Sequence, residues 1–442
     1  MAQIPHFPIP VTGASAPGAG ASARPKPIHE SPWHPRWLLA APHRLGFLAA
    51  AVMMAVSALW WGTALWAQAA GLSVTWAVPP SAAHALVMSQ SFMPLFMVGF
   101  LFTAGPRWLG LPEVHTRTLL IPVTVFILGW VIALTGFHAH RFIASLGLMG
   151  VAWAWSTLVL HFWRLVRLSR AGDKLHATWV AISCAVGALV LWGAALTTAM
   201  EWTNALRSLI QFGIWCFLAS TFAVVSHRML PFFTVSALPM LDAWHPLWLL
   251  WALLGLLWLQ APLAALEIWL WPWPSVMRWA QAALELPAAI LLIWLAIRWG
   301  LMQSMRIRLL AMLHVALVWL GLAFGLAAIS HALMALTEGE MSLGLAPTHA
   351  LTMGYLGGTM LAMTTRVASG HSGRPLAADN PVWVMYWLLH AATLARVVAA
   401  LWPAATLVLV LVTSLVWATV CVGWAVRYGN WFGRVRRDGK PG

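Results

Sequence analysis

Charged residues are scarce in this sequence. The 442 residues include 25 Lys and Arg and 11 Asp and Glu, which together make 8%, whereas soluble domains carry about 25%. This scarcity excludes an ordinary soluble enzyme, a disordered chain and a coiled coil. The apolar runs are also continuous rather than alternating, which excludes a transmembrane β-barrel.

Cysteine and the common catalytic motifs are also scarce or missing. Cys184, Cys216 and Cys421 lie far apart in apolar runs and form no CxxC pair, so the sequence predicts no disulfide framework. No phosphate-binding Walker loop, dinucleotide-binding GxGxxG turn, HExxH or GxSxG stands out. A CxxCH motif is missing as well, so any heme is b-type and not covalently attached.

The sequence is rich in apolar segments that are long enough to form transmembrane helices. Hydrophobic residues make up 61% of the chain, and the mean hydropathy is +0.81. A helix needs about 20 apolar residues to cross a bilayer, so the length suits an all-α, polytopic protein of about 12 transmembrane helices in a lipid bilayer. The predicted helices cover residues 45–69, 83–105, 118–136, 143–163, 178–199, 205–226, 246–269, 277–297, 308–336, 346–366, 382–400 and 403–426.

The basic residues predict the topology. With the N-terminus in the cytoplasm, 21 of the 25 Lys and Arg residues fall on cytoplasmic segments, as the positive-inside rule requires. The same rule explains the net charge of +14 without a nucleic-acid partner. We therefore predict a disordered basic cytoplasmic tail at 1–40, a twelve-helix membrane domain at 41–428, and a basic cytoplasmic C-terminal tail at 429–442.

Two glycine patterns indicate close helix packing. Gly321 and Gly325 in the ninth helix, and Gly354 and Gly358 in the tenth, have GxxxG spacing. This spacing lets helix backbones approach each other. We expect the ninth and tenth helices to lie in the interior of the bundle.

Histidines inside the apolar runs are candidates for metal ligands, because ionisable groups in a membrane are costly and often functional. His84 and His349 lie in the first turns of the second and tenth helices, at nearly equal depth near the outer face. A heme between them would receive one imidazole from each side. Arg207 and Arg396 lie at the same level, where they would pair with heme propionates or simply extend to the interface.

A second group of histidines is predicted near the cytoplasmic side. Imidazoles gathered there would bind copper or a second heme, although each His has the alternative of a structural hydrogen bond. His331, near the outer end of the ninth helix, is assigned to the outer group. The inner group comprises His314, His227, His390 and His371, the last of them placed in the loop after the tenth helix.

One acidic residue also lies within an apolar run. Glu285 is near the middle of the eighth helix. It is either a proton carrier or a carboxyl that stays protonated or paired.

The segment from Pro347 to Leu376, PTHALTMGYLGGTMLAMTTRVASGHSGRPL, resembles the signature of the NnrS family. Weaker resemblances lie in Phe100–Trp108, FLFTAGPRW, in Ser226–Thr234, SHRMLPFFT, and in Leu313-His314 followed by Trp319. The order and spacing extend the resemblance over about residues 40–430. One departure is at His84-Ala-Leu-Val-Met88, where the family often has H-A-H-E-M.

The resemblance implies a twelve-helix protein of the bacterial inner membrane that contains heme and copper and is linked to nitric oxide and nitrosative stress. The matching residues are His84, His314, His349 and His371, with Arg366 and Arg374. It leaves the molecular activity open. We expect a heme b and copper protein that protects against nitric oxide, either by binding it or by passing electrons from a periplasmic or quinol donor. The alternative is a membrane transporter or delivery protein for heme or copper, in which methionines and histidines act as way-stations.

Overall fold

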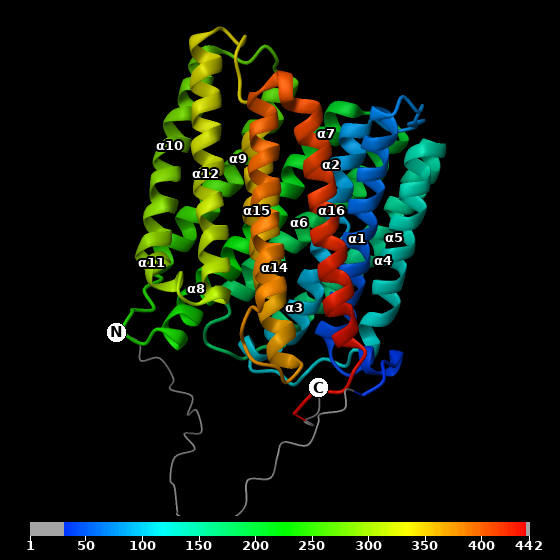
Figure 1. Cartoon of the computed structure of the whole chain (residues 1–442), viewed down its shortest axis with the longest axis vertical. Helices are drawn as coiled ribbons and strands as arrows, with labels where there is room; N and C mark the ends of the chain where they lie inside the picture. The colour runs from blue at the N-terminus through cyan, green and yellow to red at the C-terminus, as the bar shows by residue number, and fades with distance from the viewer. Residues whose placement is uncertain (1–30, 439–442) are drawn as a thin grey trace, which may run out of the picture.

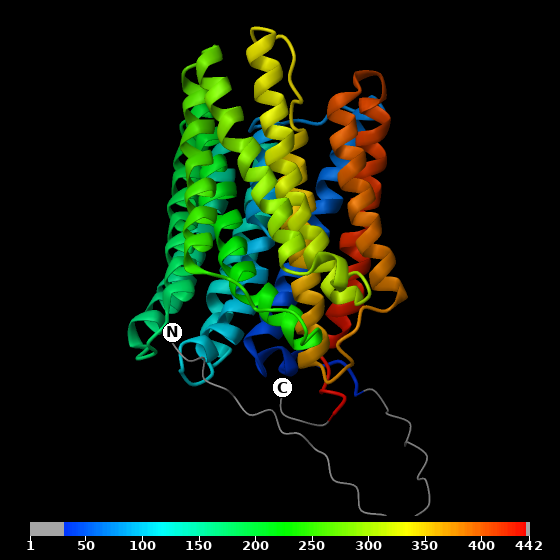
Figure 2. The same ribbon diagram turned by 90° about the vertical axis from the view of Figure 1, so that its left-hand side faces the viewer.

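The computed structural model describes residues 31–438, and within this range the chain is helical without strands. The helices run alongside one another along the long axis of the molecule (Figures 1 and 2). The all-α fold predicted from the hydropathy is confirmed. Every backbone N–H and C=O group in a membrane needs an internal partner, and helices of this length supply it.

Eleven segments within the described residues are long and apolar enough to cross a membrane. Two of them are compound: α2 (Pro80–Gln90) continues into α3 (Met93–Trp108), and α7 (Thr203–Phe212) continues through η2 (Gly213–Ala219) into α8 (Ser220–Ala237). The nine others are α1 (Pro42–Ala69), α4 (Arg117–Ala139), α5 (Arg141–Leu168), α6 (Leu175–Ala199), α9 (Leu247–Trp269), α10 (Ser275–Arg298), α12 (Arg308–Leu336), α15 (Asn380–Leu401), and α16 (Thr406–Phe432) with the short η4 (Pro403–Ala405) before it.

A twelfth crossing is made from three shorter pieces. α13 (Ala346–His349), η3 (Ala350–Gly357) and α14 (Gly358–His371) follow one another without a break. All three pack along α12, and their 26 residues have a helical length of about 39 Å. This segment is less apolar than the other eleven because it carries the Thr, Gly and His residues of the sequence signature. This segment and the eleven apolar spans together make twelve, which is the number of helices predicted from the sequence.

The two ends of the described chain meet at one end of the bundle. The N–H of His34 donates to the carbonyl of Gly433 (2.8 Å), and the N–H of Val435 donates to Ser31 (2.9 Å). α1 and α16 lie side by side, with the start of α1 and the end of α16 at the lower end of both views (Figures 1 and 2). An even number of membrane crossings places the two ends of the chain on the same side of the membrane, as seen here. That the shared end faces the cytoplasm stays a prediction.

The predicted tails are only partly described. Residues 1–30 and 439–442 lie outside the described residues. Within the predicted N-terminal tail, Pro35–Leu39 form a short 3-10 helix, η1. At the other end, α16 continues to Phe432, four residues past the predicted end of the membrane domain at 428. A short α11 (Leu301–Ser304) connects α10 and α12.

Close helix packing occurs where the glycine patterns predicted it. A side chain on Gly354 would collide with the Trp319 ring of α12, and one on Gly321 would come within 2.7 Å of Ile293 on α10. Because neither glycine has a side chain, α12 can pack tightly against both η3 and α10. α12 is accordingly one of the most enclosed helices of the bundle.

Two π-helical segments interrupt the bundle. η2 lies within the span Thr203–Ala237, η3 directly follows His349, and the two segments contact each other. A π-turn adds a residue to the helical turn and is frequent at functional sites. Its effect here is to rotate the residues before it, including His349, relative to those after it.

Candidate functional site

The upper end of the bundle brings His84 and His349 together with one arginine. His349 and Arg396 are both near enough to His84 to interact with it electrostatically, although the three residues come from α2, α13 and α15. His84 is held by stacking on Trp61, with ring centroids 4.2 Å apart. The His84 Nδ1 is buried and has no hydrogen-bond partner.

The orientation of His349 leaves one ring nitrogen for a ligand. Its Nδ1 lies 2.9 Å from the carbonyl oxygen of Leu345. A carbonyl oxygen only accepts hydrogen bonds, so Nδ1 carries the proton and Nε2 carries the free lone pair. A histidine fixed by a backbone carbonyl in this way is the usual arrangement of a metal-binding imidazole.

The two predicted arginines differ in position. Arg396 is half-buried and lies near both His84 and His349. Arg207 is exposed on α7, which packs against α2. Arg396 is therefore the better placed of the two to contact a group held by the two histidines.

His331 lies with two carboxylates. Its Nδ1 is 2.7 Å from Glu285 Oε2, and its Nε2 is 4.0 Å from Glu267 Oε2. Because both of its ring nitrogens face carboxylates, we do not include His331 among the proposed metal ligands. Glu285, identified from the sequence as either a proton carrier or a paired carboxyl, has His331 as its partner.

The predicted inner group of histidines is distributed over several places. His314 Nε2 contacts the Thr234 hydroxyl at 3.0 Å, and His390 Nδ1 accepts a hydrogen bond from the Trp319 indole at 2.8 Å. Within residues 31–438, no three His, Cys, Asp or Glu side chains are arranged to hold a metal ion. The histidines of this group therefore do not converge on one site.

Each of the other two predicted inner histidines has a histidine neighbour. His227 Nδ1 lies 3.0 Å from His176 Nε2, and the His227 Nε2 lies 3.2 Å from the carbonyl of Pro246. His371, the last residue of α14 and not part of a loop, lies next to His43 of α1, with ring centroids 4.4 Å apart. Both ring nitrogens of His227 are thus occupied, whereas the His43 Nδ1 is buried without a partner.

The His43–His371 pair lines a polar pocket of about 440 Å³ at the end of the bundle where the described termini meet. Arg107, Glu113 and Arg436 line it as well. Two metal–nitrogen bonds of about 2 Å at a right angle would place two imidazole rings roughly 4.5 Å apart. The spacing of His43 and His371 is therefore compatible with one shared metal ion.

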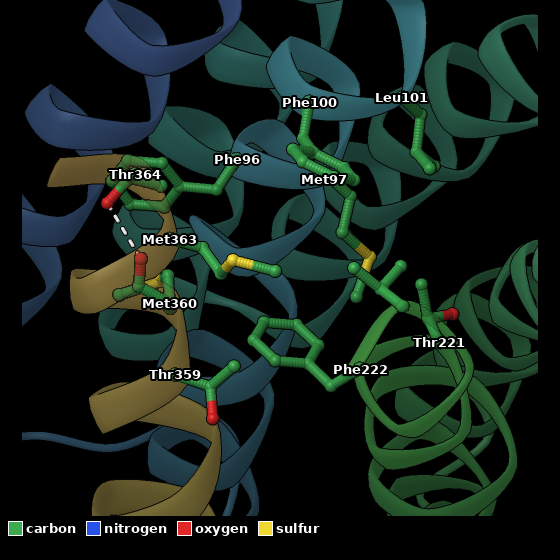
Figure 3. Close-up of a pocket in the computed structure, with 11 residues that line it drawn as sticks. Phe96, Met97, Phe100, Leu101, Thr221, Phe222, Thr359, Met360, Met363 and Thr364 are labelled. Atoms are coloured by element: carbon green, nitrogen blue, oxygen red, sulfur yellow. Dashed lines mark hydrogen bonds between the residues drawn. The ribbon is translucent and has the colours of Figure 1, made fainter. Parts of the chain in front are cut away.

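A second, smaller pocket of about 50 Å³ lies deeper in the bundle between α3, α8 and α14. It is apolar, and the side chains of Met97 and Met363 extend into it with the Phe222 ring beside them (Figure 3). Met360 also lines it. Thioether sulfur is a soft donor that favours Cu(I), and it is equally good core packing.

The two pockets follow each other along the same pair of helices. α3 supplies Met97 to the apolar pocket and Arg107 to the polar one. α14 supplies Met363 to the first and His371 to the second, eight residues apart, which corresponds to about 12 Å along a helix. The thioether sulfurs of Met97 and Met363 near the centre of the bundle are thus followed, toward its end, by the imidazole of His371.

The sequence signature, the twelve crossings and the histidines at the ends of α2 and α13 agree with one known family. A model described as the NnrS protein matches residues 37–436. The chain belongs to the NnrS family. Comparison with curated proteins finds no match. NnrS membership suggests a membrane protein of the nitric oxide response, in a family associated with metal and heme binding.

Two of the histidines in these clusters are not predicted from the sequence. His43 and His176 lie just before the predicted helix starts at residues 45 and 178, but they are 2% and 4% exposed and each contacts another histidine. Each is the second residue of a long helix, after Pro42 and Leu175 respectively. A predicted helix start three residues earlier would have placed both histidines inside the bundle. Their partners, His371 and His227, are 328 and 51 residues away in the sequence, so no local pattern predicts the two pairs.

Proposed function

We propose that this NnrS-family protein binds heme b between His84 and His349 and copper at a second site, and that it protects the cell against nitric oxide at these metals. The observation that carries the proposal is the pairing of two imidazoles from distant helices. His349 has its Nε2 free, and His84 has a buried nitrogen without a partner. Both features are expected of axial ligands.

The residues around this pair fit a heme. The Trp61 ring fixes the plane of His84, and Arg396 lies near both imidazoles. A guanidinium is well suited to a propionate, because it can donate two parallel hydrogen bonds. Bound heme iron would supply either nitric oxide binding at an open coordination position or electron transfer from a periplasmic or quinol donor. The protein holds the two imidazoles on α2 and α13.

The visible spectrum of the detergent-purified protein tests this proposal. We expect b-type bands in the dithionite-reduced protein and a shift of those bands when nitric oxide is added to an open iron. Bands that nitric oxide leaves unchanged favour electron transfer through iron with two histidine ligands. A protein without heme bands after expression with sufficient heme contradicts the proposal.

For copper, the His43–His371 pair is the best supported site. Imidazole is a common copper ligand, and the His43 Nδ1 is buried without a partner in a pocket that Glu113 also lines. Both ring nitrogens of His227 are occupied. His314 and His390 each keep one buried ring nitrogen without a partner, but they contact Thr234 and Trp319 and are not paired with a second histidine as His43 is. They are therefore weaker candidates.

Replacing His43 and His371 together by Ala is expected to remove most of the bound copper and to leave heme b in place, because the two sites lie at opposite ends of the bundle. The measurement is metal and heme content per chain after copper loading and desalting. His115→Ala, an exposed loop histidine, is the control and should keep both. Copper that stays at the control level in the double variant excludes this pair.

The second candidate function is a copper carrier. It is favoured by Met97 and Met363, which extend into one pocket between α3 and α14 (Figure 3), and by His371, which follows on α14 in the polar pocket. Thioethers hold Cu(I) weakly enough to exchange it, and imidazoles at the end of the bundle would receive it. A protein that binds copper and lacks heme bands in the experiment above would favour this function.

A further inference from the structure

Three ionisable side chains meet inside the membrane-spanning part of the bundle, apart from the heme and copper sites proposed above. They are Glu267 of α9, Glu285 of α10 and His331 of α12. An ionisable group inside a membrane is expensive and usually functional. Three such groups from three helices therefore need an explanation beyond packing.

The three side chains form a series from the surface to the interior. The exposed fraction of the side chain falls from 24% for Glu267 to 14% for His331 and 1% for Glu285. Glu267 is two residues from the end of α9, His331 is five from the end of α12, and Glu285 is ten from the start of α10. At 1.5 Å per residue these positions are about 3, 8 and 15 Å from the helix ends.

The imidazole connects the two carboxylates through different nitrogens. His331 Nε2 lies 4.0 Å from Glu267 Oε2, and His331 Nδ1 lies 2.7 Å from Glu285 Oε2. An imidazole can accept a proton on one nitrogen and release another from the opposite nitrogen. The 4.0 Å separation is a distance that a small side-chain rotation or a bridging water closes.

The inner end of the series is a buried oxygen without a partner. Glu285 Oε1 makes no hydrogen bond in the described structure. An unpaired buried carboxylate oxygen costs free energy, whereas a protonated carboxyl at the same place costs much less. Glu285 Oε1 is thus a buried acceptor at the inner end of the series that has no donor.

We propose that Glu267, His331 and Glu285 form a proton-uptake site, open to water at the end of the bundle opposite the described termini. A proton bound to Glu267 passes to His331 Nε2, and the proton on His331 Nδ1 passes to Glu285 Oε2. Glu267 is then ionised, Glu285 is neutral, and the imidazole carries its proton on Nε2; it returns to its first tautomer when Glu285 gives its proton back to Nδ1 and Nε2 releases its proton to Glu267. One proton moves inward, and no electrons are exchanged.

Arg278 is a buried charged residue on the same helix as Glu285. It lies on α10 seven residues before Glu285, about 10 Å away along the helix, and its guanidinium donates to the carbonyl of Met334 on α12 at 2.8 Å. Before and after the transfer His331 is neutral and one of the two carboxyls is protonated, so the other, ionised carboxylate is balanced by the charged Arg278 guanidinium.

Infrared spectroscopy of the complete protein in lipid tests the site, with the C=O stretching band of a protonated carboxyl as the readout. Wild type is expected to show a carboxyl band that appears as the pH is lowered and that shifts after exchange into D₂O. Glu285→Gln should lose this band, whereas Glu340→Gln, which changes an exposed loop carboxylate, should keep it.

The two outer residues are tested by the rate of exchange. His331→Gln and Glu267→Gln should keep the band of Glu285 but slow its exchange with D₂O by on the order of a hundredfold, the size of a typical acid–base contribution. Heme content, measured on the same samples, should stay at the wild-type level because the site does not contact His84 or His349. A pH-dependent band that survives Glu285→Gln, or wild-type exchange in His331→Gln, overturns the proposal.

Discussion

The double substitution His84→Ala with His349→Ala is expected to abolish heme binding. Both imidazoles come from the first turn or two of their helices, and Arg396 is near both. Loss of both axial ligands leaves a b-type heme without any bond from the protein to its iron. Heme per chain, measured as the pyridine complex after purification, should fall more than about tenfold, the effect of losing over 1.4 kcal/mol of binding free energy.

The single substitutions and a control complete this experiment. His349→Ala alone is expected to be the more severe, because its Nδ1 bond to Leu345 already sets the ring for coordination. His115→Ala should retain wild-type heme, since His115 is an exposed loop residue. Full heme retention in the double variant would show that the heme, if present, is held elsewhere.

Gly147→Ala is expected to destabilise the bundle strongly. A methyl group at Gly147 of α5 would lie within 2.6 Å of the Gly129 carbonyl oxygen and closer still to the Ala133 N–H of α4. Both neighbours are backbone atoms, so relief requires separating α4 from α5 along an extensive contact. Overpacking costs about 1–3 kcal/mol even where side chains can adjust, and more is expected here.

The matched control for this variant is Gly150→Ala. Gly150 is on the same helix, but its nearest neighbour across the contact would be the Gly129 Cα at 3.7 Å, an ordinary contact. Ala also has the higher helix propensity by about 1 kcal/mol. Thermal unfolding in detergent should therefore show a lower Tm for Gly147→Ala and an unchanged or higher Tm for Gly150→Ala. Equal Tm values would contradict the close α4–α5 packing.

The accuracy of the helix predictions differed along the chain. The ninth helix was predicted at 308–336 and is Arg308–Leu336, whereas the sixth was predicted to end at 226 and continues to Ala237. The reason is that hydropathy ends a helix where polar residues begin. Ser226, His227 and Arg228 begin such a stretch, but they lie on a helix whose Phe233 side is buried.

The candidate sites were predicted less completely than the helices. The pairing of His84 with His349 followed from equal depth on two helices, which a known rise per residue supplies. The neighbours of His331 and His371 could not be predicted, because the depth of a residue in the membrane does not determine which helices are adjacent. His331 was assigned to the outer group, yet it lies against Glu285 and Glu267.

The sequence by itself determined the membrane fold, the number of crossings and the family, because apolar length and local motifs are properties of continuous segments. Only the tertiary structure decided which helices are neighbours. It brought His43 to His371, aligned Met97 and Met363 in one pocket, and set two carboxylates around His331. These contacts join residues far apart in the chain, and they depend on how the side chains of all twelve crossings pack together.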